Sequence, residues 1–422
     1  MLTSLSTALS GLTADGIGFD VIGNNLANLS TTGFKSSNVA FDDLMSQSMN
    51  AGLQVGLGVG APTTERDFTQ GSLTATGGSF DAAIQGSGFF VVRDTSNQLL
   101  YTRAGNFQLD SEGTLTTASG QAVEGWMATN GAVNAVGPVG NITVPINASA
   151  PPSATTQMSI DANLDATATV GDTSATWSTP IQVYDSLGTT HTLTMTFTKT
   201  AANSWSYTVS LPGDDVTAGT AGTPYAIPNA TGTLTFDTQG QLTSPAAPPP
   251  ATNGVVPISI PGLADGAADL NVNWSLYTSS GTSHITQFAS ASASAGTDAD
   301  GATTGEITGV GISNGGNVTV KYSNGQDKVV AQIALATIRN PESLIATGQN
   351  NLQAGPDTAA ASIGAANSGD RGGIVGGSLE GSNVDMATEF TNLIVLQRGY
   401  EANAKVITAS EQMLTDTINL KQ

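Results

Sequence analysis

Few side chains in this chain could do chemistry, because it has two histidines and no cysteine. His191 alternates with the apolar residues of a strand-like stretch, so we expect it to be buried in a β-strand or to lie at a strand edge. His284 lies in a Ser/Thr-rich stretch and has no carboxylate or second histidine at helical spacing. Neither histidine therefore belongs to a sequence motif for catalysis or metal binding.

Two short motifs resemble functional signatures, but the residues around them do not fit the corresponding sites. The pattern at 311–315 matches a nucleophile elbow, which must run from a strand into a helix, whereas the residues after it continue as a strand. Asp298 and Asp300 could begin a calcium loop, but its first and twelfth ligand positions would be Gly296 and Ile307. The sequence thus assigns no catalytic, cofactor-binding or metal-binding residue, and it predicts that the protein is not an enzyme.

The charge of the chain limits its partners. The 422 residues carry a net charge of −21 and include only twelve basic residues. Between Arg103 and Lys321 the single basic residue is Lys199. Without a cationic surface the chain is not expected to bind nucleic acid or an anionic membrane.

The composition also bears on where the protein works. A chain rich in Gly, Thr, Ser, Asn and Ala, without thiols, fits an extracellular protein without disulfides. The first basic residue is Lys35, so a positively charged start typical of a signal peptide is missing, and no apolar run reaches membrane-spanning length. A secreted β-rich hydrolase or carbohydrate-binding module is an alternative class. It would need a pair of carboxylates or an aromatic platform, but aromatic residues make up only 5% and are scattered.

The longest predicted element is a C-terminal helix over 386–421, with no proline and only Gly399 as glycine. Ser382 and Asn383 can cap its start, and Asp385 suits its first turn. At 1.5 Å per residue it would be roughly 55 Å long and apolar along one side, so it needs a partner. Its heptad seam comprises Met386, Phe390, Leu393, Gln397, Tyr400, Ala404, Ile407, Glu411, Leu414, Ile418 and Lys421.

The N-terminal residues predict a second helix that could be this partner. It should end near residues 30–32, with Gly33 just after the helix. Gly16 and Gly23 lie on its seam, where a missing side chain lets another backbone come close. The alternative is an ordinary helical hairpin packed on the core of one domain. The seam comprises Leu2, Leu5, Leu9, Leu12, Gly16, Phe19, Gly23 and Leu26.

Between the helices the hydrophobic period changes to two, which is typical of β-strands. The stretches 89–92 and 99–101 flank a turn and predict a hairpin. Asp110, Asp185 and Asp237 are each followed three residues later by glycine, which predicts three further turns between strands.

The predicted fold class is mainly β, with α-helical coiled-coil termini. Between the termini we expect nested β-domains of sandwich or barrel type in a discontinuous multidomain chain. A second β-domain is inserted into the first. The predicted parts are a terminal helical domain (1–33 and 382–422), a Gly-rich linker (34–70), a discontinuous β-domain (71–146 and 289–360), an inserted outer β-domain (147–288) and a Gly-rich return linker (361–381).

Several stretches resemble the bacterial flagellar rod and hook proteins. Residues 20–35, DVIGNNLANLSTTGFK, resemble the N-terminal signature of this family. Residues 378–385 and 397–405 resemble its C-terminal signature, and residues 81–90 and 101–107 resemble its shared β-domain. These motifs cover both ends and part of the middle, whereas the inserted segment matches nothing distinctive.

Within this family, rod subunits are shorter in the middle, so the length of the chain and its added β-domain resemble a hook subunit. The resemblance implies a structural subunit, without a cofactor, that assembles with itself into a curved, flexible, hollow tube and transmits torque from rod to filament. A distal rod subunit is the alternative. The implied partners are the rod, hook cap and hook–filament junction proteins and the flagellar type III export apparatus, with export to the flagellum outside the cell and no cleaved signal peptide.

The two predicted helices would carry the contacts between subunits. Apolar seam residues would be buried between the helices. Amide side chains would fix the register of the helices through polar contacts. The residues expected in self-assembly are Leu5, Leu9, Leu12, Phe19, Asn24, Asn25, Leu26, Asn28, Phe390, Leu393, Gln397, Tyr400, Asn403, Ile407, Leu414 and Ile418.

Overall fold

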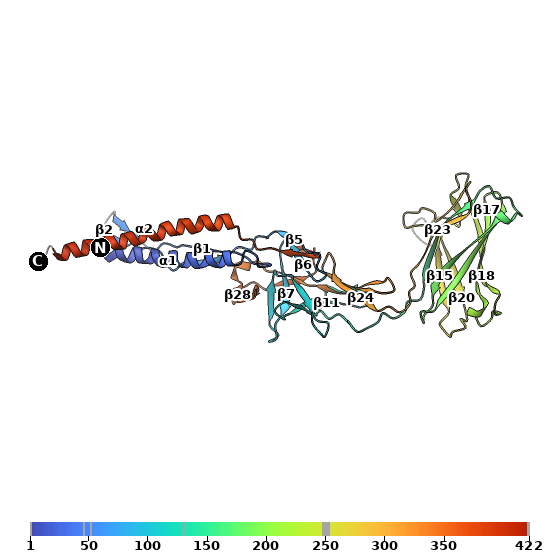
Figure 1. Ribbon diagram of the computed structural model, residues 1–422, viewed down its shortest axis with the longest axis horizontal. Coiled ribbons are helices and arrows are strands. Elements are labelled where there is room, and N and C mark those ends of the chain that lie inside the picture. Colours follow the sequence, from blue (N-terminus) through green and yellow to red (C-terminus); the bar gives the residue numbers. More distant parts are fainter. Residues whose placement is uncertain (1, 45–46, 51–52, 130, 247–253, 420–422) are drawn as a thin grey trace. The chain divides into compact units, whose positions relative to one another are not determined.

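The computed structural model describes residues 2–44, 47–50, 53–129, 131–246 and 254–419 (Figure 1). Lys421 of the predicted C-terminal seam and residues 45–46 and 51–52 of the predicted linker lie outside the described residues. The chain divides into two compact units. Unit 1 comprises residues 1–146, 309–320 and 327–422, and unit 2 comprises residues 147–308 and 321–326. Residues 289–308, which the sequence analysis placed with the discontinuous β-domain, are thus part of unit 2.

Both predicted terminal helices are present in unit 1. Helix α1 spans Leu2–Ala27 and α2 spans Met386–Asn419. α1 ends earlier than expected, because the next turns form hydrogen bonds between residues three apart, such as Asn28 N–H to Asn25 O. Gly33 does adopt the positive φ (68°) expected after a helix.

The start of α2 is capped by a different residue than predicted. Asp385 Oδ1 accepts a hydrogen bond from Thr388 N–H at 2.8 Å, which makes Asp385 the N-cap. Asn383 instead accepts from Ser36 N–H and donates to Asp67 O. The side chain of Asn383 therefore joins the entry of α2 to the segment after α1 rather than capping the helix.

Short strands occupy the two segments that the sequence analysis described as linkers. After α1, β1 (Ser37–Ala40) pairs with β4 (Thr63–Arg66), and β2 (Gln47–Asn50) pairs with β3 (Leu53–Val55). Before α2, three strands pair with earlier parts of the chain. These pairs are β30 (Ser362–Gly364) with β27 (Leu335–Thr337), β31 (Gly373–Gly376) with β6 (Ala82–Gln85), and β32 (Ser378–Glu380) with β5 (Leu73–Ala75).

The main sheet of unit 1 has 14 strands and is built from two separate parts of the chain. Its apolar core includes Phe89, Tyr101, Trp126 and Leu352. The remaining strands of this sheet are β7 (Phe89–Arg93), β8 (Leu99–Thr102), β9 (Phe107–Leu109), β10 (Leu115–Thr117), β11 (Ala122–Thr129), β12 (Ala132–Val133), β13 (Gly140–Asn141), β24 (Ile307–Ile312), β25 (Asn317–Tyr322), β26 (Asp327–Ile333), β28 (Ile345–Gly348) and β29 (Asn351–Gln353).

Unit 2 contains two five-stranded sheets, with strands that alternate buried and exposed side chains. Its core holds Trp274, whose ring lies 5.1 Å from that of Tyr207 and 6.1 Å from that of Phe197. The first sheet comprises β15 (Thr176–Tyr184), β16 (Thr190–Ala201), β17 (Ser204–Pro212), β18 (Pro224–Phe236) and β19 (Leu242–Ser244); the second comprises β14 (Gln157–Asp165), β20 (Val255–Ile260), β21 (Leu270–Ser275), β22 (Ile285–Phe288) and β23 (Ala293–Ala299).

The three turns predicted from aspartate and glycine are confirmed. Each glycine N–H bonds to the carbonyl of the aspartate three residues earlier, and each turn connects two antiparallel strands. The hairpin of β7 and β8 is also confirmed. Separate apolar cores in the two units, with a helix at either end of the chain, confirm the predicted fold class.

Candidate assembly interface

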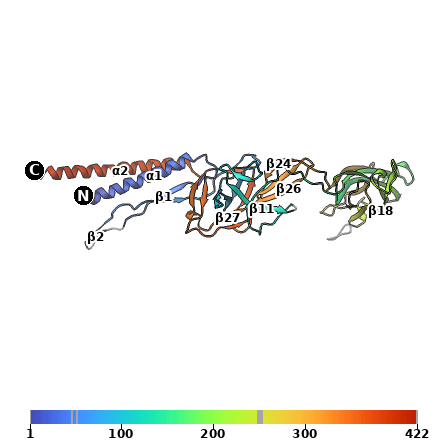
Figure 2. The same ribbon diagram turned by 90° about the horizontal axis from the view of Figure 1, so that it is seen from below.

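α1 and α2 lie side by side and run in opposite directions (Figures 1 and 2). Their contacts recur every seven residues on both helices, as in a coiled coil. Successive contacts join Gly11 to Asn403, Gly18 to Leu396 and Asn25 to Glu389.

Two glycines allow this close approach. A Cβ atom added to Gly11 would lie 2.6 Å from Asn403 Nδ2, and one added to Gly18 would lie 2.6 Å from Leu396 Cδ1. Gly16 and Gly23, which the sequence analysis placed at the close contact, have no atom within 4 Å of such a Cβ. Within one chain that expectation is wrong, because α2 packs against the face of α1 where the side chains are smallest. This face lies one residue away from the leucine seam.

The predicted contact residues of α1 therefore flank the helix pair instead of lying at its centre. Leu9 is 58% exposed and Asn24 is exposed. Only Asn25 is buried, with 1% of its surface exposed. The half-buried members of the set are Leu5, Leu12, Phe19, Leu26 and Asn28.

On α2 the predicted residues also divide between covered and open positions. The ring of Tyr400 lies 6.1 Å from that of Phe19, and Asn403 Nδ2 donates to Asp15 Oδ2 at 3.1 Å. These two contacts, together with the hydrogen bond between Asn25 and Glu389, bring predicted residues of one helix against the other helix. The exposed members are Phe390, Gln397, Tyr400 and Ile418, and the half-buried members are Leu393, Asn403, Ile407 and Leu414.

The first turns of α2 carry an apolar belt, which we define as Phe390, Leu393, Ile394, Val395 and Leu396. Five of the seven residues from 390 to 396 are apolar, so the belt runs around the helix and is not confined to one face. Leu396 packs against Gly18, but Ile394 and Val395 are 57% and 63% exposed. The heptad pattern missed these two residues, because they lie outside the seam.

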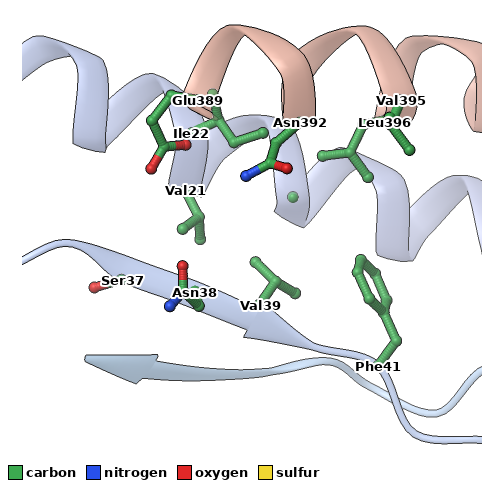
Figure 3. A pocket seen from close by; sticks show the side chains of 11 residues that line it. Val21, Ile22, Ser37, Asn38, Val39, Phe41, Glu389, Asn392, Val395 and Leu396 are labelled. Atoms are coloured by element: carbon green, nitrogen blue, oxygen red, sulfur yellow. The ribbon is translucent and has the colours of Figure 1, made fainter. Parts of the chain in front are cut away.

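A cavity of about 260 Å³ lies between α1, α2 and β1 (Figure 3). Figure 3 shows Val39 and Phe41 on one side of it and Val395 and Leu396 on the other. The cavity thus opens beside the apolar belt. Its lining is apolar enough to receive an apolar side chain.

Polar side chains fix the register of the two helices at one end. Asn25 Nδ2 donates to Glu389 Oε1 at 2.8 Å and to Ser37 O at 2.8 Å. Asn25 Oδ1 accepts from Ser37 N–H at 3.0 Å. Both Asn25 and Glu389 are buried, so a shift of either helix would leave buried polar atoms without partners.

We expect Asn25→Asp to destabilise the helix pair by about 2–3 kcal/mol, because a carboxylate would replace the amide donor and face the Glu389 carboxylate. Hydrogen exchange of α1 and α2 amides in the monomeric chain measures the effect. Asn24→Asp is the matched control, since Asn24 is exposed and its Oδ1 only accepts a bond from Asn28. Equal exchange in the two variants would contradict the registry role of Asn25.

A buried ionic cluster lies where both helices join the β-strands of unit 1. Glu380 is fully buried, and its two carboxylate oxygens contact Lys35 Nζ at 2.6 Å and Arg103 Nη1 at 3.2 Å. Gly71 N–H also donates to Glu380, and Lys35 donates to Thr69 O. The cluster links the segment after α1, the segment before α2 and the residue that follows β8.

Burial lowers the pKa of Lys35 below its usual value, although the hydrogen bond and charge of Glu380 act in the opposite direction. Burial likewise lowers the pKa of Arg103, against the charge of Glu380. The carboxylate of Glu380 therefore offsets part of the cost of burying both cations. The sequence analysis did not single out these three residues, although each lies within a stretch that carries the family resemblance.

Four family models match the chain, and together they describe subunits of the flagellar rod and hook. Among the described residues no helix is long and apolar enough to cross a membrane. The models are "Flagella basal body rod protein" at residues 5–35, "Flagellar hook protein FlgE/F/G D1 domain" at 83–163, "Flagellar basal body protein FlaE D2 domain" at 157–302 and "Flagellar basal body rod FlgEFG protein C-terminal" at 375–420.

Full-length relatives narrow this class. The chain is 35% identical to the flagellar hook protein FlgE of Salmonella typhimurium, over 99% of this chain and 100% of the relative. It is 34% identical to that of Treponema pallidum, over 100% of both, and 32% identical to that of Escherichia coli, over 99% of this chain and 100% of the relative. The chain belongs to the flagellar hook protein family and is a structural subunit of the hook. Nothing in these matches favours the distal rod alternative.

Proposed function

We propose that copies of this chain polymerise through the α1–α2 pair into a curved, hollow tube that joins the flagellar rod to the filament and transmits torque. The observation that carries this proposal is the apolar belt. α1 covers only one side of α2, whereas apolar side chains surround it between residues 390 and 396. A helix that is apolar on all sides is stable when it is buried on all sides.

The leucine seam of α1 supports the same arrangement. α2 meets the small residues of α1, so Leu9 and its neighbours on the seam remain available to a further helix. Burying one such leucine or valine side chain contributes about 1.5–3 kcal/mol. An apolar side chain of a neighbouring copy would fill the cavity beside Val395.

The buried ionic cluster supports a role in torque transmission. Torque applied to the β-strands of one subunit must reach its helices without loosening their attachment. Glu380, just before α2, is joined to Lys35 after α1 and to Arg103 after β8 through charged hydrogen bonds, which are stronger than neutral ones. We propose that this attachment keeps each subunit rigid while the tube bends.

The individual partner proteins are proposed from family membership. We propose that the polymer contacts the rod at one end and the hook–filament junction at the other, grows beneath a hook cap, and leaves the cell through the flagellar type III export apparatus without a cleaved signal peptide. In this role the subunit is a mechanical part, and we assign it no catalytic activity.

Val395→Asp tests the proposal. We expect the variant to remain a folded monomer, because Val395 is 63% exposed in the single chain, and to lose polymerisation, because the carboxylate would be buried between copies. Electron microscopy and sedimentation of the purified protein measure polymerisation, and circular dichroism confirms folding. Curved tubes formed by the wild-type chain would indicate a hook subunit, whereas straight tubes would indicate a rod subunit.

Gln412→Asp is the control for this variant, because it adds a similar charge to an exposed polar position of the same helix. It should polymerise far better than Val395→Asp. Tubes formed by Val395→Asp at the wild-type concentration would contradict the proposed interface.

A further inference from the structure

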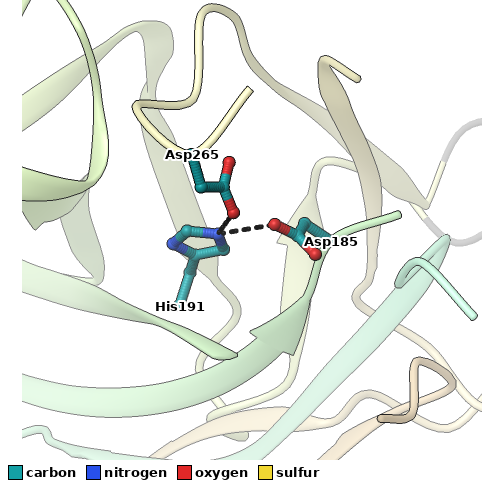
Figure 4. A group of neighbouring side chains, drawn as sticks. All are labelled: Asp185, His191 and Asp265. Carbon is teal, nitrogen blue, oxygen red and sulfur yellow. Dashed lines mark hydrogen bonds and ion pairs between the residues drawn. The ribbon is translucent and has the colours of Figure 1, made fainter. Parts of the chain in front are cut away.

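Three aspartates surround His191 in unit 2. His191 Nδ1 lies 3.1 Å from Asp215 Oδ2, and Nε2 lies 3.3 Å from Asp185 Oδ2 and 4.0 Å from Asp265 Oδ2. Figure 4 shows the Nε2 side of the ring facing the carboxylates of Asp185 and Asp265. The predicted burial of His191 in a strand is confirmed, since it is 3% exposed, but the sequence did not indicate these neighbours.

The hydrogen bond to Asp215 determines which ring nitrogen carries the proton. A carboxylate only accepts hydrogen bonds, so Nδ1–H donates to Asp215. In the neutral ring, Nε2 then has a lone pair, which faces the oxygen atoms of Asp185 and Asp265. With Nε2 unprotonated, three acceptor atoms therefore converge on one point: Nε2 and one carboxylate oxygen each of Asp185 and Asp265.

Beside a neutral His191, the negative charge of this cluster is also uncompensated. Asp185 is fully buried. Within the described part of the chain, no lysine or arginine lies within 4.0 Å of the carboxylates of Asp185, Asp215 or Asp265. Buried charges in proteins are paired with an opposite charge or coordinate a metal ion. With His191 neutral, a bound cation would supply the positive charge that these carboxylates lack.

The local structure holds the donor atoms in place. Asp185 Oδ1 accepts hydrogen bonds from Leu187 N–H and Thr189 N–H, both at 2.8 Å. Asp110 and Asp237 make the same bonds in their own turns, but only Asp185 directs its second oxygen to a histidine. His191 lies six residues later on β16, where it pairs with β15 across the hairpin.

We propose that His191 Nε2, Asp185 Oδ2 and Asp265 Oδ2 bind a divalent metal ion, with Zn²⁺ as the ion that best fits the donors. In a tetrahedral zinc site with bonds of about 2.0 Å, ligand atoms lie about 3.3 Å apart. The separation of 3.3 Å between Nε2 and Asp185 matches this value, whereas Asp265, at 4.0 Å, would have to approach by several tenths of an ångström on binding. Asp215 is then a positioning residue, which orients the ring through Nδ1 as carboxylates do in many zinc sites.

The proposed site would hold three segments of unit 2 together. Asp185 belongs to the turn between β15 and β16, and Asp265 belongs to the loop between β20 and β21. Asp215 ends the short 3-10 helix Gly213–Asp215. Asp265 is exposed, so an ion can enter from solvent and a water molecule can complete its coordination. The ion would stabilise the folded unit 2.

Calorimetric titration of the purified, chelator-treated full-length chain with ZnCl₂ tests the proposal. We expect one ion to bind per chain, and Asp265→Asn to weaken binding at least tenfold because a charged ligand is lost. His284→Gln is the matched control. It removes the only other histidine, whose Nδ1 contacts Asp161 at 2.6 Å, and should leave binding unchanged. Absence of saturable binding, or loss of binding only in His284→Gln, would overturn the site.

Nitrogen NMR of the His284→Gln variant separates a metal ion from a second proton on the ring. This variant retains a single histidine, so its two ring nitrogens can be assigned directly. With one equivalent of Zn²⁺ at neutral pH, we expect Nε2 to shift as a metal-bound nitrogen while Nδ1 keeps its proton. If both nitrogens remain protonated under these conditions, a proton occupies the position and the metal proposal is wrong.

Discussion

Glu380→Gln is expected to lower the free energy of unfolding of unit 1 by about 3–5 kcal/mol, because it removes the charge that two buried cations share. The side chains of Lys35 and Arg103 are only 3% and 5% exposed, so water cannot replace the lost carboxylate. Glutamine has nearly the same shape as glutamate. The loss of stability would therefore result from the missing charge and not from a change in packing.

Hydrogen exchange of the monomeric chain in increasing urea, read by mass spectrometry, measures this loss in each unit separately. Peptides from unit 2 should exchange as in the wild-type chain. Glu401→Gln is the matched control, because its ion pair with Arg398 spans 3.7 Å and both side chains are largely exposed. An unchanged unfolding midpoint of unit 1 in Glu380→Gln would show that the cluster contributes little to stability.

Gly105→Ala is expected to destabilise the β-strands of unit 1 by about 4 kcal/mol or more, an effect at the upper end of those seen for single substitutions. A Cβ atom at this position would overlap the backbone carbonyl oxygen of Ala82. Ala82 N–H also donates to Gly105 O at 2.9 Å, so the two backbones cannot separate without losing this bond.

Gly140→Ala provides the comparison for this prediction. Gly140 lies in the short strand β13, and no atom lies within 4 Å of a Cβ atom added there. Because three of the four tryptophans lie in unit 2, thermal unfolding of unit 1 is followed by hydrogen exchange of its peptides in both variants. Similar unfolding temperatures for the two variants would contradict the close approach of residues 82 and 105.

The helices show what a sequence pattern can predict and what it cannot. The heptad repeats predicted both terminal helices, and α2 begins at the predicted residue. They did not predict which face of α1 meets α2. Apolar periodicity shows which side chains avoid water, whereas the closest approach occurs at Gly11 and Gly18, where side chains are absent. Such a contact is defined only when the partner helix is in place.

Polar sites were harder to predict than apolar elements. Glu380 and Lys35 are 345 residues apart, and no local pattern around either residue indicates an ion pair. His191 and Asp185 are six residues apart, but Asp215 and Asp265 reach the ring from other loops. The spacing of charged residues along the chain gave no indication that these groups meet.

The sequence by itself determined the two helices, the turns of the hairpins and the β character of the middle. These features depend on residues close to one another in the chain, where backbone preference and hydrophobic period act directly. The tertiary structure decided which helix faces are covered, which cations share Glu380 and which carboxylates surround His191. Those contacts join distant segments, and they form only once the sheets and helices have brought these segments together.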